Sequence, residues 1–285
     1  AQERILDERG SQSETQFTFG GNFQDKFYLG GSIGFQNISY EIEEKFTEDY
    51  TYGPVASSSD TFLISTYEQE SFLDIRGNGV NFKIGAIYKI SDQLRAGLAI
   101  HSPTFLGFEE SYNFDSKAIY ADGFEVRADS TTTNFGYQIQ TPTRYIASLA
   151  YLLGRNGAIN AEYEYVNYSL ARLNSRNYSF DAENTDVKNK LHWAGNIRVG
   201  TEWRIKRLSI RGGFGINGDP FTGAYNFDNT RYSLGLGYRL KRFFTDLTYN
   251  LHRTVSDYEV YQGAPETARA ITLNNSVIMT FGFRF

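Results

Sequence analysis

Few residues of this 285-residue chain have the type and spacing that an enzyme's site requires. Residues 30–34 read GGSIG and match the G-x-S-x-G motif, but that motif presents its serine on a sharp strand-to-helix turn. Ser32 lies instead inside an alternating stretch that is typical of a strand. The chain has no cysteine, and its three histidines, His101, His192 and His252, lack the spacing of metal ligands. We therefore expect no enzymatic activity, no metal site and no cofactor.

Charged residues are spread along stretches in which polar and apolar side chains alternate. Within one such stretch Glu162 and Glu164 share a face, where they could act as an acid and a base or pair with arginines. The basic residues expected on the corresponding polar faces are Arg95, Arg144, Arg198 and Arg211. Each of them could bind the carboxylate of a ligand, or could instead be neutralised by Glu162, Glu164, Glu202 or Asp246.

The alternation itself predicts an all-β protein with about eleven strands. At the end of the chain, SVIMTFGFRF places five bulky side chains on one side of an extended strand: Val277, Met279, Phe281, Phe283 and Phe285. The opposite faces of the strands carry glycine, arginine, glutamate and aspartate together, which suits the lumen of a membrane barrel. A mean hydropathy of −0.45 does not argue against this, because the two faces of a barrel strand average to near-neutral hydropathy.

The connections between the predicted strands alternate between short and long. The short ones include SDQ, GRNG, IKR and LKR, and the long polar ones are residues 40–71, 103–141, 169–190, 217–230 and 253–272. Tight periplasmic turns opposite long extracellular loops are typical of outer-membrane barrels. We therefore predict a transmembrane antiparallel β-barrel of the bacterial outer membrane, in one domain over residues 1–285. The net charge of −5 gives no indication of a nucleic-acid partner.

Two hairpins carry a resemblance to a known family. Residues 77–104, GNGVNFKIGAIYKISDQLRAGLAIHSPT, and residues 141–173, TPTRYIASLAYLLGRNGAINAEYEYVNYSLARL, resemble the FadL/TodX family of outer-membrane transporters of hydrophobic compounds. The resemblance implies a complete barrel of fourteen strands with an N-terminal hatch, and a cargo such as long-chain fatty acids or aromatic hydrocarbons. It also implies that the ligand is first captured between two long extracellular loops. The family's Asn-Pro-Ala hatch motif does not occur in this sequence.

The first two predicted loops are unusually rich in apolar residues. The residues expected to form a capture groove there are Phe62, Leu63, Tyr67, Phe105, Leu106, Phe108 and Tyr112. A groove with few polar groups is what an apolar ligand requires. The alternative is that these side chains pack against one another and fold the loops over the barrel's mouth.

Strand parity leads to a prediction about the barrel's completeness. With about eleven crossings, the first strand near residues 14–22 and the last strand both run toward the periplasm, whereas a closed bacterial barrel has an even number of antiparallel strands. Residues 15–22, TQFTFGGN, would then correspond to the family's fourth strand. We expect the hatch and the first three strands to be lacking from this chain or supplied by another polypeptide.

Two functions follow as hypotheses. The first is transport of long-chain fatty acids or other hydrophobic small molecules through the outer membrane. The alternative is a barrel that does not transport but serves as a docking or shuttle partner in an outer-membrane secretion or assembly complex. The expected partners are a hydrophobic small molecule, outer-membrane lipid and lipopolysaccharide, and a possible protein partner or separate N-terminal portion.

Overall fold

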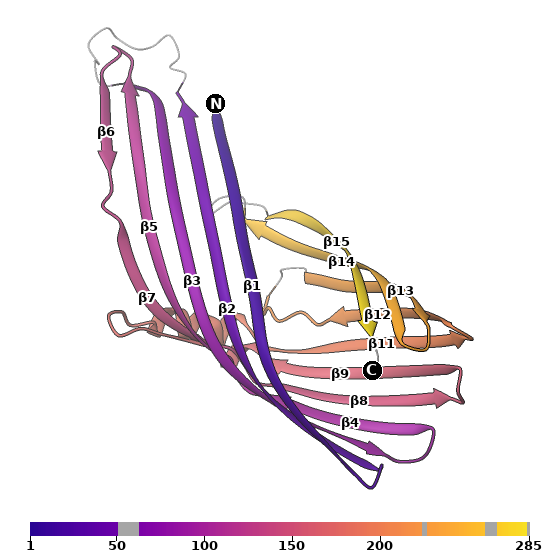
Figure 1. The fold of residues 1–285 in the computed structure, drawn as a ribbon. Helices are drawn as coiled ribbons and strands as arrows, with labels where there is room; N and C mark the ends of the chain where they lie inside the picture. Colours follow the sequence, from indigo (N-terminus) through magenta and orange to yellow (C-terminus); the bar gives the residue numbers. More distant parts are fainter. Residues whose placement is uncertain (51–62, 224–226, 260–266, 284–285) are drawn as a thin grey trace.

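In a computed structural model of the chain, most of the described backbone belongs to one antiparallel β-sheet (Figure 1). The structure describes residues 1–50, 63–223, 227–259 and 267–283. Eleven strands follow one another as antiparallel neighbours: β1 (Gln2–Phe23), β2 (Phe27–Asp49), β3 (Ile64–Lys89), β4 (Leu94–His101), β8 (Arg144–Leu153), β9 (Gly157–Asn167), β11 (Trp193–Ile205), β12 (Leu208–Asn217), β13 (Phe227–Arg239), β14 (Phe243–Glu259) and β15 (Thr267–Phe283). They form the wall expected of a barrel.

Four further strands extend this wall on one side. They are β5 (Phe105–Tyr120), β6 (Glu125–Asp129), β7 (Thr133–Gln140) and the short β10 (Arg172–Asn174). Strand β3 belongs to both parts, because residues 83–89 pair with β4 while residues 64–80 pair with β5. Together with the long ends of β1, β2 and β3 these strands stand well beyond the rest of the wall (Figure 1). We call this part the extension.

The prediction of long loops is wrong for two segments. Of residues 40–71, the described part continues β2 as far as Asp49 and begins β3 at Ile64. Residues 103–141 form β5, β6 and β7 rather than a loop. Residues 169–190 contain β10 and a helix, α1 (Asp181–Lys190), which follows the 3-10 turn η1 (Tyr168–Leu170). The two later loops are shortened, since β13 begins at Phe227, β14 runs to Glu259 and β15 begins at Thr267.

The loop prediction failed because the strands reverse their polarity partway along. On the outer face of β2, Leu29, Ile33 and Phe35 are exposed apolar side chains, whereas Asn37 and Glu41 follow on the same face. A polar stretch outside the membrane belt has the composition of a loop, although its alternation is that of a strand.

Neighbouring strands reverse at the same level. The last apolar row of the outer face consists of Phe35, Val80 and Phe105, which lie opposite one another in register. The next outward-facing row begins with Asn37 and Asn78. Between these rows the outer face changes from one suited to lipid to one suited to water.

Below that level the outer face is apolar throughout the wall. Its exposed side chains include Phe19, which is 74% exposed, and Leu234, which is 67% exposed. Leu236, on the same face as Leu234, is 54% exposed rather than packed in a protein core. Among the described residues only Leu106, Val166, Ala194 and Val255 are buried hydrophobic residues, so the fold is not organised around a conventional core.

No helix in the described part of the chain is long and apolar enough to cross a membrane. The two outermost strands of the wall, β1 and β15, each pair with one strand within the described ranges, β2 and β14 respectively. The sheet therefore has two edges there that its own strands do not pair.

Candidate functional site

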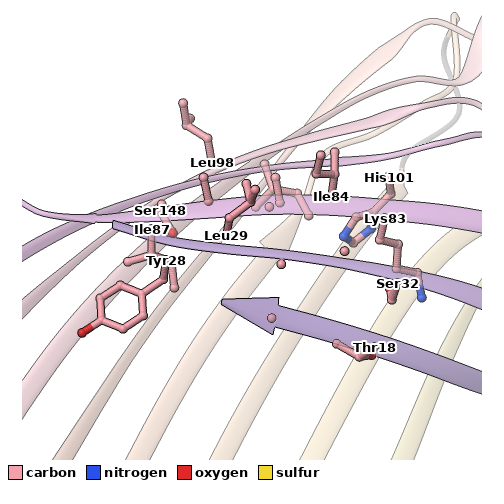
Figure 2. A pocket seen from close by; sticks show the side chains of 18 of the residues that line it. Thr18, Tyr28, Leu29, Ser32, Lys83, Ile84, Ile87, Leu98, His101 and Ser148 are labelled. Carbon is pink, nitrogen blue, oxygen red and sulfur yellow. The ribbon is translucent and has the colours of Figure 1, made fainter. Parts of the chain in front are cut away.

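The inner face of the wall holds a pocket of about 990 Å³ (Figure 2). Most of the residues that line it point inward from β1, β2, β3, β4, β8, β9 and β11, as the register of these strands requires. Part of its lining has no side chains, because the strands carry glycine there, at Gly20, Gly30, Gly85 and Gly97. The pocket therefore combines a small-residue wall with the charged side chains described next.

One row across the pocket is strongly basic. Ser32, Lys83, His101 and Arg144 lie opposite one another on β2, β3, β4 and β8, so their side chains share the inner face. Figure 2 shows Lys83 and His101 beside Ser32. Three cationic or ionisable nitrogen groups in one row attract an anion unless acidic partners neutralise them.

Lys83 is already neutralised within the chain. Its Nζ lies 2.8 Å and 3.0 Å from the two carboxylate oxygens of Glu14 on β1. Asn81 donates a further hydrogen bond of 3.0 Å to the same carboxylate. Glu14 is therefore held between two residues of β3, and it links the first and third strands of the wall.

Arg198 of β11 is neutralised by a second network. Its guanidinium pairs with Glu162 and lies 3.4 Å from the carboxylate of Glu164. Asn196 donates to Glu164 at 2.6 Å, and Glu164 is only 4% exposed. Glu162 and Glu164 therefore form ion pairs with an arginine, which is one of the two roles that the sequence allowed for them.

Arg211 of β12 is neutralised in the same way. Its guanidinium lies 2.9 Å from Glu202 and 2.5 Å from Asp246. Glu202 also pairs with Arg204 at 2.6 Å. Two of the four predicted lumen arginines thus serve the wall's own ion pairs.

Arg144 differs from these two. It is exposed on the inner face beside His101, and within the described ranges no hydrogen bond or ion pair involves its guanidinium. Arg95 also faces inward, nearer the short-turn end, and its Nε is buried without a hydrogen-bond partner among the described residues. Of the four predicted lumen arginines, Arg144 is therefore best placed to bind an anionic group in this pocket.

A second feature lies directly above the pocket. The inner face of the extension continues the lumen face of β2 and β3, and there its side chains on β2, β3, β5 and β7 are largely apolar, with Glu110 of β5 among them. Its residues are Ile38, Tyr40, Ile42, Leu73, Ile75, Leu106, Phe108, Tyr112, Phe114, Phe135 and Tyr137. We call this set the apolar inner face.

The predicted capture residues distribute unevenly over the extension. Tyr67, Leu106, Phe108 and Tyr112 lie on the inner side of their strands. Phe105 lies on the outer side, in the last apolar row, and is 50% exposed. Leu63 precedes β3 and is partly exposed. Phe62 lies outside the described residues.

Part of the apolar inner face is covered by its own chain. Phe108 stacks on Tyr137 with ring centroids 5.3 Å apart, and Tyr137 stacks on Phe135 at 5.6 Å. Phe180, immediately before α1, contacts both rings of β7, and Tyr178 packs against Phe180 at 4.8 Å. The self-packing expected as an alternative therefore occurs around β7, while Leu73, Ile75 and Tyr112 take no part in this cluster.

The sequence predicts Arg144 of the basic row and Leu106, Phe108 and Tyr112 of the apolar inner face, but not the other members of either set. In the sequence nothing distinguishes Lys83 or Glu14 from other charged residues, and the spacing of His101 argues only against a metal site. The row follows from the short turn between β3 and β4, which fixes the register and brings His101 opposite Lys83. Among the described residues no cluster of side chains has the composition of a metal site.

Three solved structures share this fold. The monoaromatic hydrocarbon channel CymD matches over 97% of this chain and 74% of its own, with a TM-score of 0.60 and 13% identity. A FadL homologue of Pseudomonas aeruginosa matches over 96% and 66%, with a TM-score of 0.62 and 14% identity. The toluene transporter TodX of P. putida matches over 97% and 70%, with a TM-score of 0.65 and 13% identity.

Comparison by sequence adds nothing to this, because no protein-family model and no curated protein matches the chain. The structural likeness confirms the predicted fold class, a FadL/TodX-like transmembrane barrel, and the outer-membrane location goes with that fold. CymD is described as a monoaromatic hydrocarbon channel and TodX as a toluene transporter.

Proposed function

We propose that this chain forms the wall of an outer-membrane channel for hydrophobic small molecules, and that long-chain fatty acids are among its ligands. The likeness in fold supports the general class of cargo, since CymD is named as a monoaromatic hydrocarbon channel and TodX as a toluene transporter. The observation that carries the proposal is the continuity of the apolar inner face with a lumen pocket that contains Arg144.

The two surfaces suit the two ends of a fatty acid. Each methylene that moves from water onto an apolar surface contributes about 0.8 kcal/mol, so the apolar inner face favours an acyl chain. The carboxylate needs a cation, and the guanidinium of Arg144 can donate two parallel hydrogen bonds to it. Lys83 and Arg198 are less suitable because Glu14, Glu162 and Glu164 already bind them.

The experiment compares a fatty acid with the fatty alcohol of the same length. Binding of each to purified protein is measured by isothermal calorimetry, with Arg144→Ala and Arg144→Lys as variants. A charge-assisted hydrogen bond contributes about 1.5–3 kcal/mol, so Arg144→Ala should weaken fatty-acid binding roughly tenfold to a hundredfold. Binding of the alcohol should stay unchanged, and Arg144→Lys should restore part of the affinity for the acid.

A matched pair on β3 tests the apolar inner face. Leu73 faces inward, whereas Phe72 is its neighbour on the outer face. Leu73→Ser should weaken binding of both the acid and the alcohol, and Phe72→Ser should not. Equal effects of the two substitutions, or binding of neither ligand by the unmodified protein, would contradict the proposed function.

A further inference from the structure

The outer face of the extension contains a polar hollow of about 870 Å³. It lies on the opposite side of the sheet from the apolar inner face. Residues of β2, β3, β5, β7 and β10 line it, together with residues 175–177. The transport path proposed above does not use this hollow.

A row of amide side chains crosses the hollow. Asn37, Asn78, Gln138 and Asn174 come from four strands, and the strand in the middle contributes Gly107. The register places them in order: Asn37 opposite Asn78, Asn78 opposite Gly107, Gly107 opposite Gln138, and Gln138 opposite Asn174. Within the described ranges none of the four amide groups makes a hydrogen bond to another residue of the chain.

Glycine makes the surface concave at this point. A Cβ atom on Gly107 would have no neighbour within 4 Å, and on Gly136 its nearest neighbour would be 3.9 Å away. A Cβ atom at either position would therefore enter open space in the hollow. The amide side chains of the neighbouring strands therefore surround a part of the hollow that no side chain fills.

The rim adds charge. Arg76 pairs with Asp74 through bonds of 3.1 Å and 3.2 Å, so its charge is already offset. Arg176 lines the same hollow and makes no ion pair or hydrogen bond among the described residues. Glu109 lies on the rim as well. The site therefore offers several amides, one available cation and one carboxylate.

The position of the amide row relative to the apolar belt indicates which part of the membrane it faces. It is the first row above Phe35, Val80 and Phe105, the last apolar row of the outer face, so it lies where headgroups of the outer leaflet lie against the wall. Side-chain amides both donate and accept hydrogen bonds, which matches the hydroxyl groups of sugars. We propose that the hollow binds the saccharide headgroup of an outer-leaflet glycolipid of the lipopolysaccharide class, with Arg176 on an anionic substituent of that headgroup.

The test uses the protein in nanodiscs of phosphatidylethanolamine. Fluorescently labelled rough lipopolysaccharide is titrated, and its released core oligosaccharide and inorganic phosphate are added as competitors. Two variants test the site in different ways. The double variant Asn78→Ala/Gln138→Ala removes two amide groups, whereas Gly107→Phe places a bulky side chain in the hollow and removes no polar group. Each should weaken glycolipid binding by about tenfold, which corresponds to about 1.4 kcal/mol.

Asn113→Ala is the control, because Asn113 also faces outward on β5 but lies outside the hollow. It should leave glycolipid binding unchanged, and all variants should keep the fatty-acid affinity of the unmodified protein. The core oligosaccharide should compete and inorganic phosphate should not. Unchanged glycolipid affinity in both site variants would overturn the proposal, as would full competition by phosphate alone, which would indicate a site for charge rather than sugar.

Discussion

Arg198 is a lumen residue whose charge stabilises the wall and is not available to a ligand. It lies against Glu162 and Glu164, and the second of these is almost completely buried. Arg198→Ala leaves Glu164 with only its hydrogen bond from Asn196 and no cation to offset its charge, so it should destabilise the barrel by about 1–3 kcal/mol. The measurement is the temperature at which the folded band disappears in a heat-modifiability gel.

Arg204→Ala is the matched control at this scale. Arg204 is on the same strand and pairs with Glu202, but Glu202 keeps Arg211 at 2.9 Å after the change. Its removal should therefore have a small effect. Adding Glu164→Gln to Arg198→Ala should recover part of the lost stability, because it removes the buried charge. Failure to do so would mean that the loss came from packing of the Arg198 side chain instead of its charge.

At the scale of the element, the level at which β2 reverses polarity can be located by substitution. Ile33 and Ser39 both face outward, but Ile33 lies inside the apolar belt, between the turn that precedes β2 and the last apolar row, whereas Ser39 lies above that row. Ile33→Arg should cost about 2–4 kcal/mol, because a cation deep in the lipid belt is unfavourable. Ser39→Arg should be close to neutral. Equal tolerance of both substitutions in assembly assays would show that β2 does not cross the belt at this level.

The strands also show how far sequence reasoning could go. Alternation was sufficient to predict the wall, since each crossing strand keeps one apolar face within the membrane belt, as in SLGLGY of β13. It failed for the upper halves of β2 and β3, where Glu41 and Asp74 replace apolar residues on the outer face and imitate a loop. The basic row of the lumen could not be predicted from types alone, because it depends on which residues of different strands lie in register.

At the scale of the whole molecule, the wall has two edges, on β1 and β15, that no other described strand pairs. In a bilayer an unpaired strand edge leaves backbone groups without hydrogen bonds, which costs several kcal/mol per group. β1 and β15 run in the same direction, since β2 and β14 are antiparallel to them and the chain alternates direction between. The structures with this fold are also longer, and the chain covers 66–74% of the three compared above. We propose that further strands, three by the resemblance to the family, complete the barrel between β1 and β15.

Protection of β1 in the membrane tests this closure. Among residues 15–22, the amides that point away from β2 should exchange with deuterium as slowly as those bonded to it if further strands cover this edge. A cysteine pair at Thr18 and Ile278, each on the inner face near an edge, should form no disulfide, because added strands separate the two positions. Fast exchange along the outer edge of β1 would mean that nothing pairs there. Efficient disulfide formation would mean that β1 and β15 meet directly and in parallel, which would refute completion by further strands.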